Sequence, residues 1–379
     1  MTLHQYRMAV LPNCCKVLCL VLLYICCCLA ELQCCRLEQH NLNCTQCNFT
    51  EVPETWDNPT SNLVDLSHNH ISDVTQFPYS PSIEVLILQH NNITSIATKA
   101  FVQLTNLKYI DLSFNLLTYA SLSPLIFQGS DNIKDYEPIP VEILKLGHNV
   151  IHALDAKVFE HLPNLTELYL DHNPLTTLDS VTILAITNAQ RNLRVLDLSY
   201  CGLTTIPDRF LHTLVKLTTL NLNGNQFTSI PCTLSEISGS LSRLSIDDNP
   251  LENFTFPALD LLEVLSLSHV NTMETLPSGA LARLPALKTL YCNQNAELRY
   301  LEDGVFTEQQ RITEASIQLE LRNNALENLP EKLGVRWGEL EVLDIRDNPW
   351  NCDCNLAWFT QSVVPTILAK HPDHIKDVR

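Results

Sequence analysis

Residues 165–173 read LTELYLDHN, with leucines at the first, fourth and sixth positions and an asparagine at the end. A strand with one buried face alternates apolar and polar residues strictly, whereas an amphipathic helix shows apolar residues three and four apart over a longer span. The nonapeptide fits neither pattern over its whole length. It therefore indicates a short strand followed by a bend.

The nonapeptide is repeated along the chain. Twelve copies close at residues 69, 91, 115, 149, 173, 201, 225, 249, 270, 295, 324 and 348, and many of these closing positions are 24 residues apart. Self-similarity at such a period is typical of a solenoid, in which each repeat forms one coil and neighbouring coils bury a continuous core. The copies therefore predict one elongated solenoid.

The middle of each copy predicts a short strand. Successive side chains of a strand lie on opposite faces. Leu168 and Leu170 are therefore expected to point into the coil, and Glu167, Tyr169 and Asp171 to point outward. After the strand the chain bends inward, so its buried backbone polar groups need partners outside the sheet.

The closing asparagine supplies these partners. Its side chain carries both a donor and an acceptor, and a buried backbone group without a partner costs about 1–3 kcal/mol. We therefore expect a row of stacked asparagines, one in each coil. Cys201 and Val270 interrupt the row, which predicts a local irregularity at the ninth coil, with Asn271 as a candidate replacement.

Phenylalanines recur in the segments that return to the next strand. Four of them stand fourteen residues before a closing position, namely Phe77, Phe101, Phe159 and Phe256. This constant offset predicts that they stack on the far side of the core.

The unit LxxLxLxxN, with returns such as ITSIATKAFVQLTNLKY (residues 93–109), resembles the typical class of extracellular leucine-rich repeats. The resemblance covers residues 61–348. It implies an α/β solenoid, namely a right-handed horseshoe of about twelve repeats with a parallel sheet on its concave face. Toll-type receptor ectodomains, Slit-like guidance proteins, adhesion proteins and matrix proteoglycans share the motif, so it specifies the fold rather than the function.

Residues 1–30 have the pattern of a secretory signal peptide. Arg7 and Lys16 precede an apolar run of 14 residues that ends at Ala30. A membrane-spanning helix needs about 20 apolar residues, so we favour a cleaved signal. The alternative is an uncleaved signal anchor, in which the cysteines at 26–28 would be available for acylation.

Cysteines mark the N-terminal end, where a stack of coils needs a cap over its exposed core. Cys34, Cys35, Cys44 and Cys47 lie in residues 31–60, which resemble the family's cysteine-rich N-terminal cap. Neighbouring Cys34 and Cys35 cannot readily bridge each other, so each is expected to reach Cys44 or Cys47, in an order that stays open. A zinc site is the alternative, but an oxidising compartment favours disulfides.

Residues 349–379 resemble the start of the family's C-terminal cap. Cys352 and Cys354 match its Cys-x-Cys pair and are expected to form disulfides, and Trp358 and Phe359 are expected to cover the last coil. The family's two downstream cysteines are missing after Cys354, so this cap is truncated or degenerate, or its thiols bridge another molecule. We expect a secreted protein, or a cell-surface protein if an anchor lies beyond residue 379.

Five asparagines agree with secretion because each begins an Asn-x-Ser/Thr triplet, the acceptor for N-glycosylation. They are Asn43, Asn48, Asn92, Asn164 and Asn253.

No catalytic motif is found, so we predict neither an enzyme nor a bound cofactor. Five histidines occupy the eighth position of their repeats, namely His68, His90, His148, His172 and His269. Because adjacent strands lie about 4.8 Å apart, a metal-binding or pH-sensing row is one interpretation. We favour solvated structural histidines, since LSHN is a common form of the repeat, and predict no metal site.

The concave face is the predicted binding surface, because exposed aromatic side chains make good anchors for a partner. A long return between Asn115 and Asn149 contains GSDNIKDYEP (residues 129–138), which is expected to protrude as a polar loop in the same region. The alternative is a set of ordinary solvated residues with a tolerated insertion. A glycan at Asn164 would block this surface if it covered the inner strands. The candidate ligand-binding residues are Tyr109, Phe114, Tyr169, Asp171, Asp197 and Tyr200.

Two functions remain in competition. The first is recognition of a protein ligand or co-receptor by a receptor, adhesion or innate-immune-type module, and the second is a structural role in the extracellular matrix. The net charge of −18 disfavours nucleic acid, and the acidic residues favour a partner with a basic patch. We favour recognition by analogy with the fold family, because neither a Ser-Gly cluster nor a long acidic tail points to the matrix.

Overall fold

The structure is a computed structural model that describes residues 34–55, 60–131, 136–188, 192–306, 317–335, 337, 340–351 and 353–370. The predicted signal peptide over residues 1–30 and Cys352 lie outside the described residues. Within the described part of the chain, none of the helices has the length and apolar character that crossing a bilayer requires.

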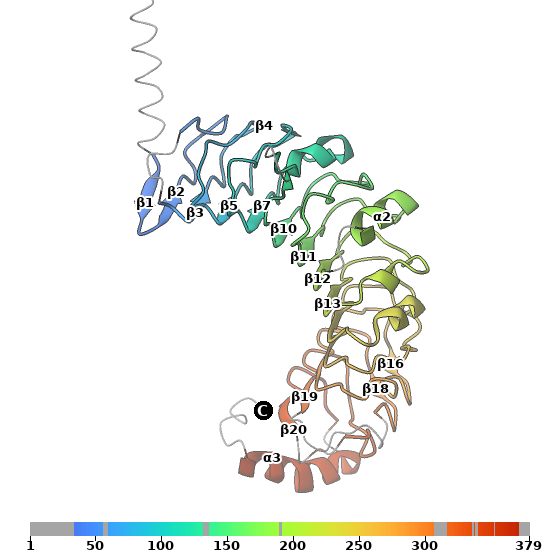
Figure 1. Ribbon diagram of the computed structural model, residues 1–379. Helices are drawn as coiled ribbons and strands as arrows, with labels where there is room; N and C mark the ends of the chain where they lie inside the picture. The colour runs from blue at the N-terminus through green and yellow to red at the C-terminus, as the bar shows by residue number, and fades with distance from the viewer. Residues whose placement is uncertain are drawn as a thin grey trace, which may run out of the picture.

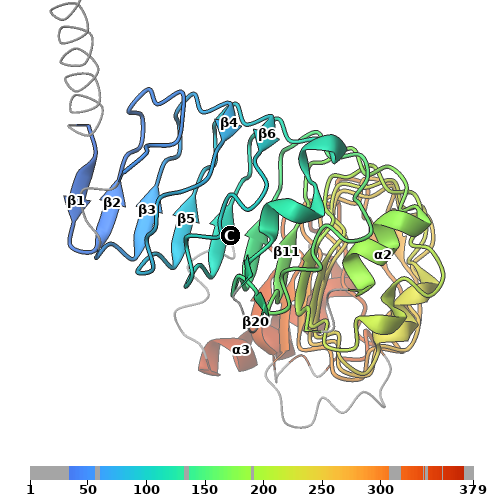
Figure 2. The ribbon, with the colours of Figure 1, turned by 45° about the horizontal axis from the view of Figure 1, so that its top comes forward.

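The chain winds into a curved solenoid whose inner side is lined by short parallel strands (Figures 1 and 2). Each copy of the nonapeptide supplies one strand, so the predicted solenoid of about twelve coils is confirmed. The strands are β3 (Leu63–Asp65), β5 (Val85–Ile87), β7 (Tyr109–Asp111), β10 (Ile143–Lys145), β11 (Glu167–Tyr169), β12 (Val195–Asp197), β13 (Thr219–Asn221), β14 (Arg243–Ser245), β15 (Val264–Ser266), β17 (Thr289–Tyr291), β19 (Ile317–Glu320) and β20 (Leu340–Asp344).

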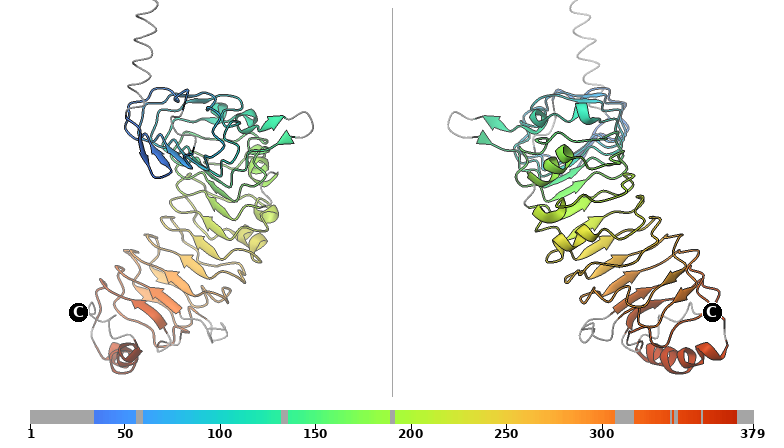
Figure 3. Two further views of the ribbon diagram at one scale, coloured as in Figure 1. Left: turned by 60° about the vertical axis from the view of Figure 1, so that its left-hand side comes forward. Right: turned by 90° about the vertical axis from the view of Figure 1, so that its right-hand side faces the viewer.

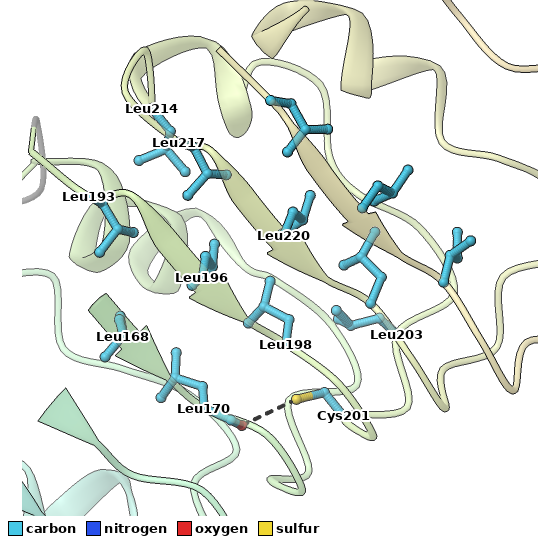
Figure 4. Packing of buried hydrophobic residues seen from close by; sticks show 14 of the residues in the cluster. Leu168, Leu170, Leu193, Leu196, Leu198, Cys201, Leu203, Leu214, Leu217 and Leu220 are labelled. Atoms are coloured by element: carbon cyan, nitrogen blue, oxygen red, sulfur yellow. Dashed lines mark hydrogen bonds between the residues drawn. The ribbon is translucent and has the colours of Figure 1, made fainter. Parts of the chain in front are cut away.

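From β3 to β19 the strands pair in one constant register, which aligns equivalent leucines from coil to coil, and the register shifts only between β19 and β20. Leu168 in β11 lies between Leu144 in β10 and Leu196 in β12, and all three are fully buried. Figure 4 shows Leu168 and Leu196 pointing into the core beside Leu170 and Leu198. Burying one such side chain contributes about 1.5–3 kcal/mol, so the stacked leucines hold the coils together.

The predicted asparagine row is present. Asn173 donates from Nδ2 to the carbonyl oxygens of Leu170 at 3.0 Å and Leu146 at 2.9 Å, and its Oδ1 accepts from the backbone N–H of Ile151 at 3.0 Å. Each asparagine therefore satisfies backbone groups of its own coil and of the preceding coil. The same pattern occurs at Asn69, Asn91, Asn115, Asn149, Asn225, Asn249 and Asn348.

The two interruptions of the row differ. The Cys201 thiol donates to the carbonyl oxygen of Leu170 at 3.3 Å (Figure 4) and so replaces part of the asparagine's function. Val270 offers no such donor, yet β15 keeps a regular register with both neighbours. The expected irregularity is therefore confined to the row of side chains. Asn271 is exposed and does not replace the missing amide.

The phenylalanine stack is confirmed for Phe77 and Phe101 in the first coils. Phe77 stacks on Phe101 with ring centroids 5.6 Å apart, and Phe101 stacks on Phe127 at 5.7 Å. Phe159 and Phe256 are buried in later coils.

Short elements cover the outer side of the solenoid. They are β4 (Asp73–Val74), β6 (Ser95–Ile96), η1 (Tyr119–Ser121), η2 (Pro124–Phe127), α2 (Ser180–Asn188), η3 (Leu211–Thr213), η4 (Cys232–Ile237), β16 (Thr275–Leu276) and β18 (Tyr300–Leu301).

The N-terminal cap is a disulfide-bonded hairpin of β1 (Arg36–Glu38) and β2 (Asn41–Asn43), and β2 continues the parallel sheet into β3. Cys34 pairs with Cys47 and Cys35 pairs with Cys44, which settles the order left open by the sequence. The buried residues Leu42, Cys44, Phe49 and Val52 belong to the same core as the first coils.

The C-terminal cap consists of η6 (Cys354–Leu356), η7 (Phe359–Val363) and α3 (Val364–Lys370). Trp358 and Phe359 pack on Trp337 with ring centroids 5.6 and 5.8 Å away, so they cover the last coil as expected. The disulfide expected at Cys354 is not formed within the described residues, where this cysteine is free and exposed. The C-terminal cap that this segment resembles has two further cysteines, and the given sequence has none after Cys354.

The long return between Asn115 and Asn149 forms a small antiparallel hairpin of β8 (Ser130–Asp131) and β9 (Tyr136–Glu137). Figure 3 shows the hairpin projecting from the side of the solenoid, which confirms the predicted protrusion. Only residues 138–142 separate the hairpin from β10. It therefore lies at the amino edge of the sheet, where the parallel strands begin.

Candidate functional site

A continuous stack of six aromatic and imidazole rings follows the carboxyl edge of the sheet, where the parallel strands end. We call it the ring stack. Its successive ring centroids are 4.4, 4.1, 3.9, 3.8 and 4.4 Å apart. Its members are His68, His90, Phe114, His148, His172 and Tyr200.

The ring stack forms because its members occupy the same position of successive repeats. Each has a positive φ between 52° and 55°, a left-handed conformation that costs a non-glycine residue about 1–2 kcal/mol. This repeated turn places every ring at the same point of its coil. Adjacent strands lie about 4.8 Å apart, which brings neighbouring rings into contact.

The stack ends at a glycine. Gly224 has the same left-handed conformation, and a Cβ atom there would lie 2.1 Å from the Tyr200 ring. Because this space is free, the Tyr200 ring lies over Gly224, and its hydroxyl donates to Asp248 Oδ2 at 2.7 Å. This hydrogen bond and partial burial raise the pKa of Tyr200 to about 12. His269 occupies the eighth position of its own repeat, but the ring contacts recorded for the described residues do not connect it to the stack.

Two histidines of the stack resist protonation. Burial and the neighbouring His68 lower the pKa of His90, against an opposing effect of Asp111. Burial and His172 lower the pKa of His148, although Asp171 acts in the opposite direction. At neutral pH His90 and His148 are therefore favoured in their uncharged forms.

A second group lies within the concave face and is called here the tyrosine–lysine cluster. Lys145 in β10 lies between Tyr109 in β7 and Tyr169 in β11, with Nζ 5.4 Å from each ring centroid. Partial burial alone would lower the pKa of Lys145, but the contact with Tyr109 and the charges of Asp111 and Asp171 raise it. The lysine is therefore a fixed cation between two aromatic rings.

Both tyrosines of the cluster are half-buried rather than fully exposed, and they donate to acidic side chains. The Tyr109 hydroxyl donates to Asp111 Oδ2 at 3.2 Å, and that of Tyr169 donates to Glu167 Oε2 at 2.8 Å. Burial is the main cause that raises the pKa of each tyrosine. The hydroxyls therefore stay protonated, and their rings are held in fixed positions.

The two predicted acidic residues have internal partners. Asp197 accepts from the Ser199 N–H at 2.9 Å and from Asn221 Nδ2 at 2.9 Å, and burial raises its pKa. Asp171 Oδ2 lies 3.2 Å from His172 Nδ1 and 3.8 Å from His148 Nε2. Their charges are thus less available to a partner than the sequence suggested.

The predicted ligand-binding residues come together on neighbouring coils but divide into two groups. Tyr109 and Tyr169 belong to the tyrosine–lysine cluster, whereas Phe114 and Tyr200 belong to the ring stack at the carboxyl edge. Their role in ligand binding stays a prediction. Sequence analysis missed Lys145, which stands at the same repeat position as Tyr169.

The amino edge of the sheet carries a hollow of about 380 Å³. The Tyr136 hydroxyl of the β8–β9 hairpin lies 2.6 Å from His161 Nδ1, so the hairpin is attached to the next coil. Asn164 is exposed in the hollow, on the edge opposite the ring stack. The hollow is lined by Glu142, Asn164, Thr166, Asn192, Arg194 and Lys216.

The predicted glycosylation sites differ in accessibility. Asn48, Asn92, Asn164 and Asn253 are exposed. Asn43 is half-buried, and its Oδ1 accepts from the N–H and hydroxyl of Thr45 at 3.0 and 2.8 Å. Glycosylation at all five stays a prediction.

Comparison with known proteins agrees with this architecture. A family model described as leucine rich repeat matches residues 62–117, 81–134 and 139–184, and a model of two leucine-rich repeat copies matches residues 191–236. A solved structure of a TLR13–ssRNA13 complex superposes with a TM-score of 0.58 over 85% of this chain and 52% of that chain, at 23% sequence identity. This likeness shows the fold alone.

Curated relatives match the chain at low identity. Human lumican is 30% identical over 235 residues, which cover 59% of this chain and 64% of lumican. Mouse tsukushi is 32% identical over 236 residues, which cover 60% of this chain and 61% of tsukushi. The chain thus spans less than two thirds of the length of these relatives. Together with the repeat and the capped parallel solenoid, the matches show that the chain carries leucine-rich repeats and has their fold.

Proposed function

We propose that the chain is an extracellular protein-binding module that uses the concave face over β7, β10, β11 and β12. Support for an extracellular location comes from the two disulfides of the N-terminal cap, Cys34–Cys47 and Cys35–Cys44. Disulfides persist in oxidising compartments and are rare in the cytosol.

The tyrosine–lysine cluster is the observation that carries the proposal. Two aromatic rings and a cation from three neighbouring strands are held in place before any partner arrives. Binding to such a surface freezes few side-chain torsions, and tyrosines are enriched among the residues that dominate protein interfaces. A broad face with fixed anchors suits a folded protein better than a small molecule.

The charge of the chain favours a protein partner with a basic patch. The net charge of −18 repels nucleic acid, whose binding depends on cationic side chains that contact phosphates. Glu167 flanks the cluster and is partly exposed. We therefore place a basic group of the partner beside Glu167, and an acceptor group of the partner beside Lys145.

A glycan at the amino edge of the sheet would leave the concave face accessible to a partner. Asn164 lies in the hollow before the strands begin, so a glycan there starts outside the tyrosine–lysine cluster. The β8–β9 hairpin borders the same edge and offers a further contact. The proposed surface thus extends from the cluster towards the hairpin.

Site-specific cross-linking tests the proposal. A photoreactive phenylalanine analogue placed at Tyr169 in the secreted chain is expected to capture a discrete partner, because Tyr169 lies at the centre of the proposed surface. The matched control places the same group at Tyr300 in β18, which is 57% exposed outside the large sheet. Equal capture at both positions would contradict the proposal. An insoluble deposit without a discrete cross-link would favour the structural matrix role.

A further inference from the structure

The geometry points to a binding site for a divalent transition-metal ion of the Zn²⁺ type formed by His148, Asp171 and His172. These residues come from two adjacent coils. They are grouped so that one ligand atom from each lies within 4.8 Å of the others. The inference goes beyond the proposed protein-binding function and does not depend on it.

The distances suit one ion shared by the three side chains. Asp171 Oδ2 lies 3.2 Å from His172 Nδ1 and 3.8 Å from His148 Nε2. A tetrahedral Zn²⁺ ion with bonds of about 2.0–2.1 Å keeps neighbouring ligand atoms about 3.4 Å apart. The imidazole lone pairs lie in the ring planes, which are 14° from parallel with centroids 3.8 Å apart, so both rings must rotate out of their stacked arrangement to direct all three ligand atoms at one ion.

The backbone makes room for the central ligand. Gly147 stands immediately before His148, and a Cβ atom at this position would lie 2.4 Å from Asp171 Oδ1. The carboxylate of one coil therefore occupies the space that a side chain of the preceding coil would fill. Any larger residue at 147 would displace Asp171 from the two histidines.

The ring stack places the two imidazole rings side by side on adjacent coils. His148 and His172 stack on each other at 3.8 Å, with Phe114 on the outer side of His148 and Tyr200 on the outer side of His172. Their side chains are 34% and 38% exposed, and that of Asp171 is 23% exposed. An ion can thus reach the three ligands from solvent.

The set of ligands selects the class of metal. Two imidazole nitrogens and one carboxylate oxygen are typical Zn²⁺ ligands, and a site with three protein ligands leaves a fourth position to water. Ca²⁺ and Mg²⁺ prefer oxygen ligands alone. We therefore expect Zn²⁺ to bind and Mg²⁺ not to bind.

Calorimetric titration of the metal-free secreted chain with Zn²⁺ tests this site, after the exposed thiols have been alkylated so that they do not bind the metal. The wild type is expected to bind one equivalent of Zn²⁺. Asp171→Asn and His172→Gln should bind Zn²⁺ at least about tenfold more weakly, because each removes a ligand and the loss of even an outer-shell partner costs about 10–100-fold in metal affinity. The control His269→Gln removes an eighth-position histidine outside the triad and should bind like the wild type.

Two results would overturn the site. One is the absence of Zn²⁺ binding by the wild type, and the other is an equivalent of Zn²⁺ retained at unchanged affinity in both triad variants. Circular dichroism of each variant checks that the solenoid is intact. Co²⁺ gives a second readout, because its visible absorption should appear in the wild type and be lost in Asp171→Asn.

Discussion

The hydroxyl of Tyr200 donates a hydrogen bond to Asp248 Oδ2 at 2.7 Å, although Asp248 lies two coils further along the solenoid. The contact exists because Gly224, in the coil between them, has no side chain under the Tyr200 ring. A single glycine thus determines where the ring stack ends and couples three coils.

Substitution of Gly224 by alanine is expected to break this relationship. The new Cβ atom would lie 2.1 Å from the Tyr200 ring, and the φ of +62° is unfavourable for alanine. We expect a loss of about 1–3 kcal/mol in the free energy of unfolding, measured by denaturant titration. The pKa of Tyr200 should also fall from about 12 towards its ordinary value, which an ultraviolet titration detects. Gly239→Ala is the control, because nothing lies within 4 Å of its added Cβ atom, and an equal loss there would contradict the explanation.

The asparagine row predicts a large effect at a single buried amide. Asn173→Ala would remove the amide partner of the Leu146 carbonyl oxygen and of the Ile151 N–H, whereas the Leu170 carbonyl oxygen would keep the Cys201 thiol. We expect the free energy of unfolding to fall by about 2 kcal/mol or more, since each unsatisfied buried group costs about 1–3 kcal/mol. Asn271→Ala, at an exposed position, should change it by less than about 0.5 kcal/mol. Similar values for the two variants would show that the row does not stabilise the coils.

The ring stack predicts that acid destabilises the fold. The pKa values of His90 and His148 are lowered in the folded state, so the folded chain binds fewer protons than the unfolded chain. Stability contributed by these neutral rings is therefore present above pH 6.5 and is lost as the pH falls through 6.5 towards their folded pKa values. The slope of unfolding free energy between pH 7.5 and 5.5 should become flatter in His90→Gln.

Magnetic resonance titration of the histidine ring protons checks the cause of this effect. Burial is the main cause of the lowered pKa of His90, and His68→Gln removes the second cause, the electrostatic interaction with His68, so the pKa of His90 should rise in this variant. An unchanged or lower pKa of His90 would show that the stacked histidines do not influence each other.

The free cysteines are expected to differ sharply in reactivity. Burial raises the pKa of both Cys201 and Cys292 to about 12, and the thiolate is the reactive form. Iodoacetamide at pH 7.5 should therefore modify the exposed Cys232 and Cys354 but leave the two buried thiols unmodified in the native protein. Peptide mapping by mass spectrometry measures this, and all four should react after unfolding in guanidinium. Rapid native modification of Cys201 would place it outside the core.

The sequence was sufficient to predict the coils because the spacing of apolar and polar residues in the repeat determines which side chains are buried and which backbone groups need a partner. Leucines spaced as in Leu165, Leu168 and Leu170 can be buried together only by a short strand followed by a bend, and the asparagine after the bend is needed for its backbone groups. The cap disulfides were predicted as a set, but their order depends on the hairpin of β1 and β2, which no local pattern reveals.

The candidate site was predicted only in part because it forms between coils. The histidines at the eighth position were recognised as neighbours, yet Phe114 and Tyr200 share that position and continue the same stack. Lys145 and Gly147 were missed because their importance depends on side chains of adjacent coils, Tyr109 and Tyr169 for the lysine and Asp171 for the glycine. A comparison of equal positions across all repeats, rather than a search for residue types, would have shown these contacts.

Hydrogen exchange of the secreted chain with and without the partner captured at Tyr169 tests the central claim most directly. We expect the partner to slow exchange at residues 109–111, 143–145, 167–169 and 195–197, which form β7, β10, β11 and β12, and to leave residues 275–276 and 300–301 of the outer sheet unchanged. Protection of the outer strands without protection of the concave strands would contradict the account.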